Sequence, residues 1–332
     1  MPPKQPVRQA PKQHKLLQNF LYVVLAGVFA IVFWQRQNIV DWIKLSNYDP
    51  PVAIVQLAAA TDMTDYGRKI WYLNKPQIQD KQPFYQSCVS NETTIVLGCY
   101  KPPEGIYLLK VTDSRLAGIE EVTAAHEMLH AAYDRLNSTE RNRVAKLIDQ
   151  FYATLDNPEV KAKIDLYKQE GADVTNELHS ILGTEVGTLT PELEAYYSQY
   201  FESRAKVIAL ANQYQAVFTD LRAKIANYDS QLKDLETKVK ANNETLKQQD
   251  AALTAESARL DGLLRSGSIA AYNQGVPAYN QSLVPYRNLL NETRSLVDKY
   301  STILDQRNAV AQEAQELNKA LDTSLQPTVS DK

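Results

Sequence analysis

The chain of 332 residues has only two cysteines, four histidines and eleven glycines, and its formal net charge is −3. Two cysteines without a CxxC spacing give no support for a cysteine-based metal or redox motif. The small negative charge gives no reason to expect nucleic acid as a partner. The apolar content of 44% is ordinary for a folded protein, although the chain is longer than one compact domain usually requires.

Two of the four histidines lie in the pentapeptide HEMLH at 126–130. At 3.6 residues per turn, His126 and His130 lie one above the other on one helix face, so both imidazoles can reach a single ion. Glu127 lies beside them, where it can take a proton from a metal-bound water. Small and apolar residues surround this trio, as expected for a helix that is buried on most sides. We therefore predict a zinc site here, in preference to a surface helix that carries two histidines by chance.

A catalytic zinc ion needs a third protein ligand and leaves its fourth position to water. The segment 176–185 follows a stretch rich in capping residues at 173–176, and it predicts a short helix with Glu177 near its start. Glu177 is therefore the preferred third ligand. The alternatives are Glu170, His179 and Glu185.

The HEMLH motif, followed some tens of residues later by an acid-led helix, resembles the Glu-zincin peptidases. The run from 177 to 197 is similar to the EFFAV-x-x-E…P-x-L-Y pattern of the Mlc titration factor A peptidases, and more distantly to the EFFAEAF segment of anthrax lethal factor. In those families the first Glu of this segment is the third zinc ligand, which implies Glu177 here. The resemblance covers about residues 120 to 200, and it fails where Leu178 and His179 replace the aromatic pair.

The chemistry expected of such a site is hydrolysis of an amide by a zinc-activated water, whose pKa the metal lowers from about 15.7 toward about 7. Glu127 is expected to take the proton and pass it to the leaving amine. Tyr167 is a candidate oxyanion stabiliser, with packing as its alternative role. Asp134 is a candidate acceptor that orients a ligand imidazole, with exposure beside Arg135 as the alternative.

The only long apolar run lies near the N-terminus. Residues 1–15 form a basic tail without an acid, which predicts disorder. The uninterrupted apolar run at 20–34 and its flanks predict a transmembrane anchor at 16–40, and no small-x-small cleavage site follows it. The excess of basic residues before the span predicts a cytoplasmic N-terminus and an extracytoplasmic remainder. Cys88 and Cys99 could then form a disulfide in an oxidising compartment, with two free thiols as the alternative.

Between the anchor and the motif, the sequence predicts a helix at 53–60 and short strands at 70–73, 94–97 and 106–111. A small sheet followed by the metal-binding helix is an α+β arrangement, so we expect a zinc metallopeptidase-like domain over 50–203. The strand at 106–111 is the best candidate for a sheet edge that binds an extended peptide.

The rest of the chain has a helical pattern. Glycine is absent from 201 to 261, and apolar residues recur at alternating steps of four and three. The seam is polar at Asn242, Gln249 and Glu256, so its second half is weaker. A Ser-Gly-Ser cluster at 266–268 then interrupts the pattern.

A second heptad series follows from 272 to 321, although Pro277 and Pro285 make its first turns doubtful as helix. The two series predict an antiparallel coiled-coil hairpin over 204–324, followed by a tail at 325–332.

These patterns predict a mainly α fold with a small α+β zincin-like catalytic domain, an N-terminal transmembrane helix and a C-terminal antiparallel coiled-coil hairpin. The predicted function is that of a membrane-anchored, extracytoplasmic zinc peptidase with Zn²⁺ as cofactor, held by His126, His130 and Glu177, and with Glu127 as general base. The expected partners are a peptide or protein substrate, the membrane, and a protein that binds the hairpin. The competing hypothesis is a membrane-anchored coiled-coil structural or adaptor protein that carries an inactive HExxH domain.

Overall fold

The structure of the protein is a computed structural model that describes residues 2–3, 13–88 and 96–323. Within these ranges, the side chains at 13–19, 23, 26, 28 and 30–34 are not described. The predicted terminal tails at 1–15 and 325–332 therefore lie largely outside the described residues.

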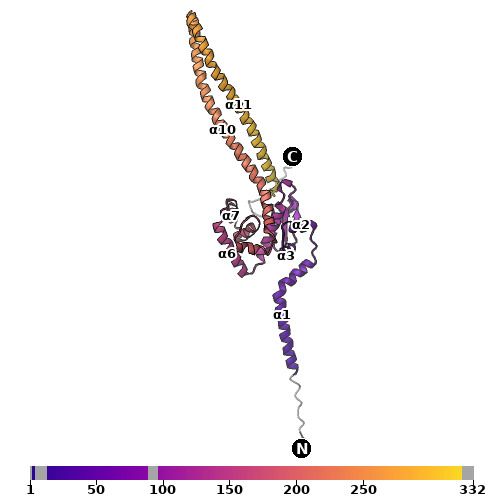
Figure 1. Ribbon diagram of the computed structural model, residues 1–332. Coiled ribbons are helices and arrows are strands. Elements are labelled where there is room, and N and C mark those ends of the chain that lie inside the picture. The colour runs from indigo at the N-terminus through magenta and orange to yellow at the C-terminus, as the bar shows by residue number, and fades with distance from the viewer. Residues whose placement is uncertain (1, 4–12, 89–95, 324–332) are drawn as a thin grey trace. The chain divides into compact units, whose positions relative to one another are not determined.

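The described chain is mainly α and divides into two compact units (Figure 1). The first unit comprises 1–91, 98–109 and 121–207, and the second comprises 92–97, 110–120 and 208–332. The second unit therefore includes a short segment from the middle of the chain besides the C-terminal helices. The predicted boundaries of the catalytic domain and hairpin stay predictions.

Three helices begin the first unit: α1 (Gln13–Ser46), α2 (Val52–Ala60) and α3 (Asp65–Leu73). Among the described residues, no helix is long and apolar enough to cross a membrane. Much of the predicted anchor at 16–40 has its side chains outside the described residues. The helix predicted at 53–60 is confirmed as α2.

The strand predicted at 70–73 is wrong, because these residues form the end of helix α3. Thr64 caps that helix by accepting a hydrogen bond from Gly67 N at 3.0 Å. Ile70, Trp71 and Leu73 are buried at helical spacing, and the Trp71 indole donates to Ile54 O at 3.2 Å. Packing of the apolar helix face has overridden the strand propensity of a β-branched and aromatic run.

A three-stranded sheet follows, with strands β1 (Gln77–Gln79), β2 (Gly98–Lys101) and β3 (Gly105–Leu109) in the order β1-β3-β2. β1 pairs parallel and β2 antiparallel to β3. The strand predicted at 106–111 is present, but the prediction that it is a sheet edge is wrong, because β3 is paired on both sides. The strand predicted at 94–97 lies partly outside the described residues.

Six helices complete the first unit around the site: α4 (Lys81–Ser87), α5 (Ile119–Asp134), α6 (Ser138–Thr154), α7 (Pro158–Glu170), α8 (Val174–Thr184) and α9 (Pro191–Tyr197). Side-chain caps start the last four: Asn137, Asn157, Asp173 and Thr190 each accept from a backbone N–H. These caps satisfy amides that a helix start would otherwise leave without partners.

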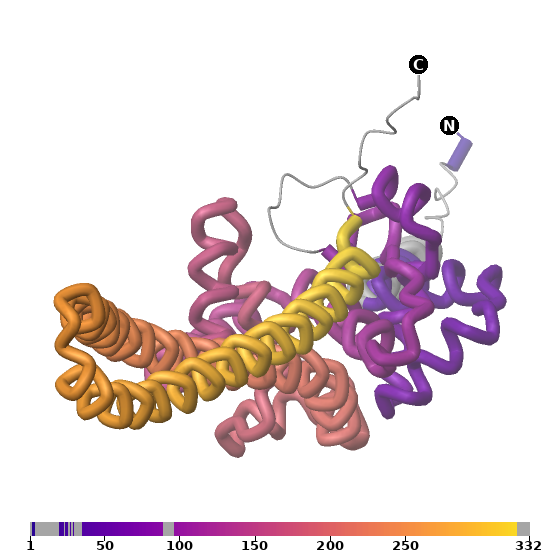
Figure 2. The backbone as a smooth tube through the Cα atoms, turned by 90° about the horizontal axis from the view of Figure 1, so that it is seen from above, coloured from indigo at the N-terminus to yellow at the C-terminus, as the bar shows by residue number. Residues whose placement is uncertain are grey.

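The C-terminal part of the chain is a helical hairpin formed by α10 (Arg204–Arg265) and α11 (Ile269–Leu321), which run side by side (Figure 2). Gly267 turns the chain between them at a φ of 73°. The doubt about the first turns of the second helix is overturned, since Pro277 and Pro285 both lie inside α11. Both prolines are exposed, so water can satisfy the carbonyls that lose an N–H partner.

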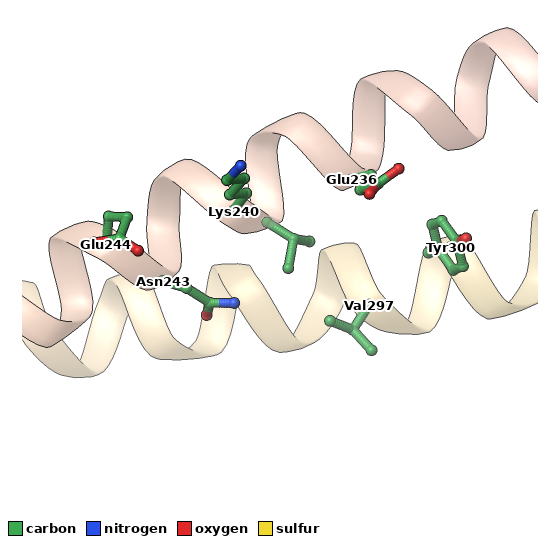
Figure 3. Close-up of a pocket in the computed structure, with 7 residues that line it drawn as sticks. Glu236, Lys240, Asn243, Glu244, Val297 and Tyr300 are labelled. Atoms are coloured by element: carbon green, nitrogen blue, oxygen red, sulfur yellow. The ribbon is translucent and has the colours of Figure 1, made fainter.

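The apolar seam of the hairpin is uneven. Leu232 and Leu235 of α10 pack with Ile303 of α11, and a second cluster at the open end of the hairpin includes Leu221 and Leu317. Further along, a cavity of about 470 Å³ separates the two helices (Figure 3). Its lining is Glu236, Val239, Lys240, Asn243, Glu244, Val297 and Tyr300. The cavity begins where the seam becomes polar in the sequence.

Candidate metal centre

Helix α5 presents the HEMLH motif from a buried position. Met128 and Leu129 are fully buried, and so is nearly every small residue around the motif. Because the helix is packed on several sides, its backbone holds the imidazoles of His126 and His130 in fixed positions relative to their neighbours. The ring centroids of the two histidines lie 4.8 Å apart.

Helix α8 brings Glu177 to the same place. Asp173 caps the helix by accepting from Asn176 N at 3.2 Å, which puts Glu177 in its first turn. A methyl group on Gly183 would lie only 2.4 Å from Leu129 Cδ1, so the glycine permits the close approach of α8 to α5. The packing of these two helices therefore determines where the third side chain lies.

The three side chains converge on one point. The Nε2 atoms of His126 and His130 lie 3.1 Å apart, and Glu177 Oε2 lies 3.8 Å and 3.7 Å from them. Ligand atoms around a tetrahedral zinc ion at 2.0–2.2 Å are about 3.3–3.6 Å from one another. The donor set and its spacing therefore fit zinc, and these three residues could hold the ion.

A hydrogen bond sets the orientation of His130. Asn176 Oδ1 lies 3.0 Å from His130 Nδ1, so Nδ1 donates and Nε2 presents its lone pair to His126 and Glu177. The sequence had suggested Asp134 for this task, but Asp134 lies 3.6 Å from Arg141 instead. Asn176 was not identified from the sequence. Its position directly before Glu177, the expected third ligand, could have indicated that its side chain lies near the metal centre.

The two imidazoles have different proton affinities. Burial opposes a charge on His126, but the adjacent carboxylates of Glu177 and Glu127 outweigh it and raise the pKa of His126. Burial, and then the neighbouring His126, lower the pKa of His130 to about 4. Burial of Glu177 is outweighed by the two imidazoles, which lower the pKa of its carboxyl. Of the two imidazoles, His126 therefore has the higher affinity for a proton.

Glu127 is 5% exposed and lies on α5 directly after His126. Its carboxylate is close to strand β2, because a methyl group on Gly98 would lie 2.8 Å from Glu127 Oε1. Glu127 does not belong to the group of three that could hold an ion. Glu127 therefore lies next to the three possible ligands without being one of them, and its role as general base stays a prediction.

Two of the alternative ligands have other partners. Glu185 accepts a hydrogen bond from Lys163 Nζ at 2.5 Å. His179 is fully buried, and its Nε2 lies 2.8 Å from the Tyr196 hydroxyl. Glu170 is likewise outside the group of three. The suggested oxyanion role of Tyr167 stays a prediction.

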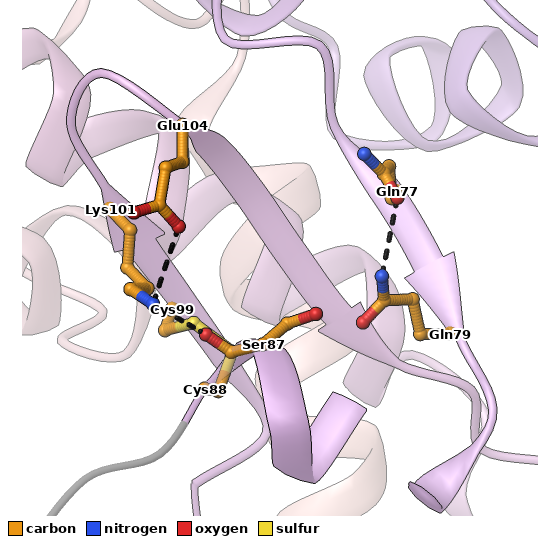
Figure 4. Close-up of a disulfide and its surroundings, with 7 residues drawn as sticks. All are labelled: Gln77, Gln79, Ser87, Cys88, Cys99, Lys101 and Glu104. Atoms are coloured by element: carbon orange, nitrogen blue, oxygen red, sulfur yellow. Dashed lines mark hydrogen bonds and ion pairs between the residues drawn. A yellow bond between two sulfur atoms is a disulfide. The ribbon is translucent and has the colours of Figure 1, made fainter. Parts of the chain in front are cut away.

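Cys88 and Cys99 form a disulfide that joins the end of α4 to β2 (Figure 4). The alternative of two free thiols is therefore excluded. The bond closes across residues 89–95, which lie outside the described residues. Disulfides persist in oxidising compartments and are rare in the cytosol.

No family model, curated protein or solved structure matches this chain. Function must therefore be inferred from the geometry of His126, His130 and Glu177 and from the sequence pattern.

Proposed function

We propose that the protein is a zinc-dependent peptidase in which His126, His130 and Glu177 hold the ion and Glu127 is the general base. When bound, zinc would polarise the scissile carbonyl and increase the acidity of water. Glu127 would accept a proton from that water and deliver it to the leaving amine. The observation that carries the proposal is the convergence of three ligand atoms within 4.8 Å beside this carboxylate.

The position of the sheet supports a peptide as substrate. β2 is an edge of the described sheet, and its first residue, Gly98, lies against Glu127. An extended peptide can add to a free strand edge through backbone hydrogen bonds. A substrate aligned along β2 would pass close to Glu127. The central strand β3 could not bind a substrate in this way, because both of its edges are already paired.

The test is hydrolysis of a quenched fluorescent peptide library by the zinc-loaded wild-type protein and by the matched Glu127→Gln variant. The proposal predicts cleavage by the wild type and loss of cleavage in the variant, with zinc content equal in both. Equal cleavage by the two proteins would contradict the role of Glu127 as the general base. Absence of cleavage in both would favour the competing hypothesis of an inactive domain.

We also propose that the chain is anchored in a membrane through the segment at 16–40. At the end of α1 an acidic side chain is buried and an aromatic one is exposed, the reverse of the usual pattern in a water-soluble protein. Asp41 is 3% exposed and pairs with Arg135 Nη2 at 2.6 Å, while Trp42 is 71% exposed. Lys69 also contacts Asp41 at 3.0 Å. These ion pairs hold the acid inward, whereas the neighbouring apolar side chains of Ile39, Val40 and Ile43 are exposed. An apolar face turned outward, in the helix that carries the apolar run, supports contact with lipid.

The Cys88–Cys99 disulfide supports the proposed extracytoplasmic location, since disulfides persist in oxidising compartments and are rare in the cytosol. Protease added to intact cells should cleave the hairpin, and alkaline carbonate should leave the full chain in the membrane fraction. Cleavage only after lysis would reverse the proposed orientation. Extraction by carbonate would contradict the anchor.

A further inference from the structure

The contact between Gly98 and helix α5 is unusually close. A methyl group on Gly98 would lie 2.6 Å from Thr123 Cγ2 and 2.8 Å from both Cγ and Oε1 of Glu127. Thr123 and Glu127 are one helical turn apart, so β2 crosses the face of α5 that also presents the general base. The φ of Gly98 is not in the left-handed region. Glycine is therefore required here for space, because a side chain would displace α5 or its side chains.

Of the two neighbours, Glu127 is the one that would yield. Thr123 is β-branched and has few rotamers in a helix, so its methyl group cannot turn away freely. Glu127 has three side-chain torsions, and both its Cγ and its carboxylate lie against the missing side chain. A larger residue at 98 would therefore rotate the general base away from its place beside His126.

The strand that carries Gly98 is held on its other face. Successive residues of a strand point to opposite faces, so Gly98 faces α5 while Cys99 points away from it. Cys99 is bonded to Cys88, and Lys101 Nζ donates to Ser87 O at 2.9 Å (Figure 4). β2 also pairs with β3 from Gly98 to Lys101. Two links to the end of α4 and one ladder thus keep the strand against α5.

We propose that Gly98 is a positioning residue for Glu127, and that the Cys88–Cys99 disulfide acts through it by fixing strand β2 against the helix of the general base. This inference rests on the proposed function for its kinetic consequence. The dependence of the Glu127 position on Gly98 can be tested whether or not the protein cleaves peptides. The ligands His126, His130 and Glu177 are not part of the contact, so binding of the ion should be insensitive to it.

The kinetic test compares Gly98→Ala with Gly262→Ala, a matched control on α10 where an added methyl group meets no atom within 4 Å. A misplacement of a catalytic group by about 1 Å can cost about 100-fold, so kcat of Gly98→Ala should fall by that order while KM and zinc content stay unchanged. Gly262→Ala should keep the wild-type kcat. An unchanged kcat in Gly98→Ala would overturn the proposal, and so would loss of zinc, since that would show disruption of the whole centre.

Two further variants separate positioning from general damage. In Gly98→Ala/Glu127→Ala, which removes both the Cγ and the carboxylate of Glu127, the added methyl group should lower the residual kcat less than it does in the presence of Glu127, because the atoms that it displaces are gone. Strictly additive losses would contradict the contact.

Cys88→Ser/Cys99→Ser should lower kcat less than Gly98→Ala does and should retain zinc. Wild-type kcat in this double variant would exclude the disulfide from the mechanism.

A readout without turnover distinguishes failure of this inference from failure of the proposed function. Crystal structures of the two proteins without metal should show the Glu127 carboxylate displaced in Gly98→Ala relative to the wild type. The distances among His126, His130 and Glu177 should be the same in both. An undisplaced Glu127 would overturn the inference even if the protein is a peptidase. A displaced Glu127 in a protein that cleaves no peptide would leave the inference standing and refute the proposed function.

Discussion

The two compact units bury different kinds of side chain. In the first unit the buried residues include polar and charged side chains: Arg204, for example, is 7% exposed and donates to Val186 O at 2.6 Å and to Glu194 Oε2 at 3.0 Å. In the second unit the buried residues are mainly leucines, spaced along two helices. Burial of a polar group is costly unless each group has a partner. The first unit therefore holds polar groups in defined positions, whereas the second is stabilised mainly by apolar contacts between two long helices.

The largest expected effect is on the general base in the first unit. Glu127→Gln removes a proton acceptor but no ligand, so kcat should fall by about 10²–10⁴-fold while zinc stays bound. Kinetics with a cleaved peptide and metal analysis of the same sample measure both. Loss of zinc in this variant would make Glu127 a ligand and would break the separation of roles.

The corresponding change in the second unit is Leu317→Ala. Leu317 is fully buried in the cluster with Leu221 and Leu321, so its truncation should lower the free energy of unfolding by about 2–5 kcal/mol. Val297→Ala is the control, because Val297 is 45% exposed and should change stability by less than about 0.5 kcal/mol. Denaturant unfolding followed by circular dichroism gives the values.

Zinc content should be the same in both hairpin variants. If Leu317→Ala lost the ion, the two units would be energetically coupled, and the contrast between them would no longer hold.

A smaller effect is expected for the residue that orients His130. Asn176→Ala removes the acceptor at Nδ1 and should weaken zinc binding by about 10–100-fold. Asp134→Asn is the matched control, and it should leave affinity unchanged because Asp134 lies beside Arg141. Competition with a zinc chelator measures both variants. If Asp134→Asn weakened zinc binding and Asn176→Ala did not, Asp134 would be the residue that orients the imidazole, as the sequence had suggested.

The smallest effect concerns protons. Because the pKa of His126 is raised and that of His130 is lowered to about 4, only His126 carries a proton that zinc must displace at mildly acid pH. Affinity should therefore fall as pH falls through the raised pKa of His126, by about tenfold per pH unit. Between about pH 5 and the raised pKa of His126, calorimetry in buffers of different ionisation enthalpy should detect about one proton released per ion. Release of two protons would show that the imidazoles are equivalent.

The sequence predicted best what local spacing determines. The helix that carries His126 and His130 and the two helices of the hairpin follow from periodicity within one segment. It predicted less well what depends on residues distant in sequence. The strand expected at 70–73 became helix α3 through packing, and the expected sheet edge at 106–111 is central because β1 and β2 pair on both sides of it.

The candidate site shows the same division. Glu177 joins the two histidines through the packing of α8 on α5, and its selection over Glu185 and His179 depends on where Lys163 and Tyr196 lie. The contact of Gly98 with Glu127 joins a strand to a helix, and no spacing in the sequence predicts it. These features required the structure.

Metal analysis of the purified full chain tests the central claim most directly. The wild type, loaded with zinc and passed through a desalting column, should retain about one zinc ion per chain, as three protein ligands imply. His126→Ala/His130→Ala should retain none, and Glu185→Gln should retain as much as the wild type. Stoichiometric zinc in the double histidine variant, or no zinc in the wild type, would contradict the account.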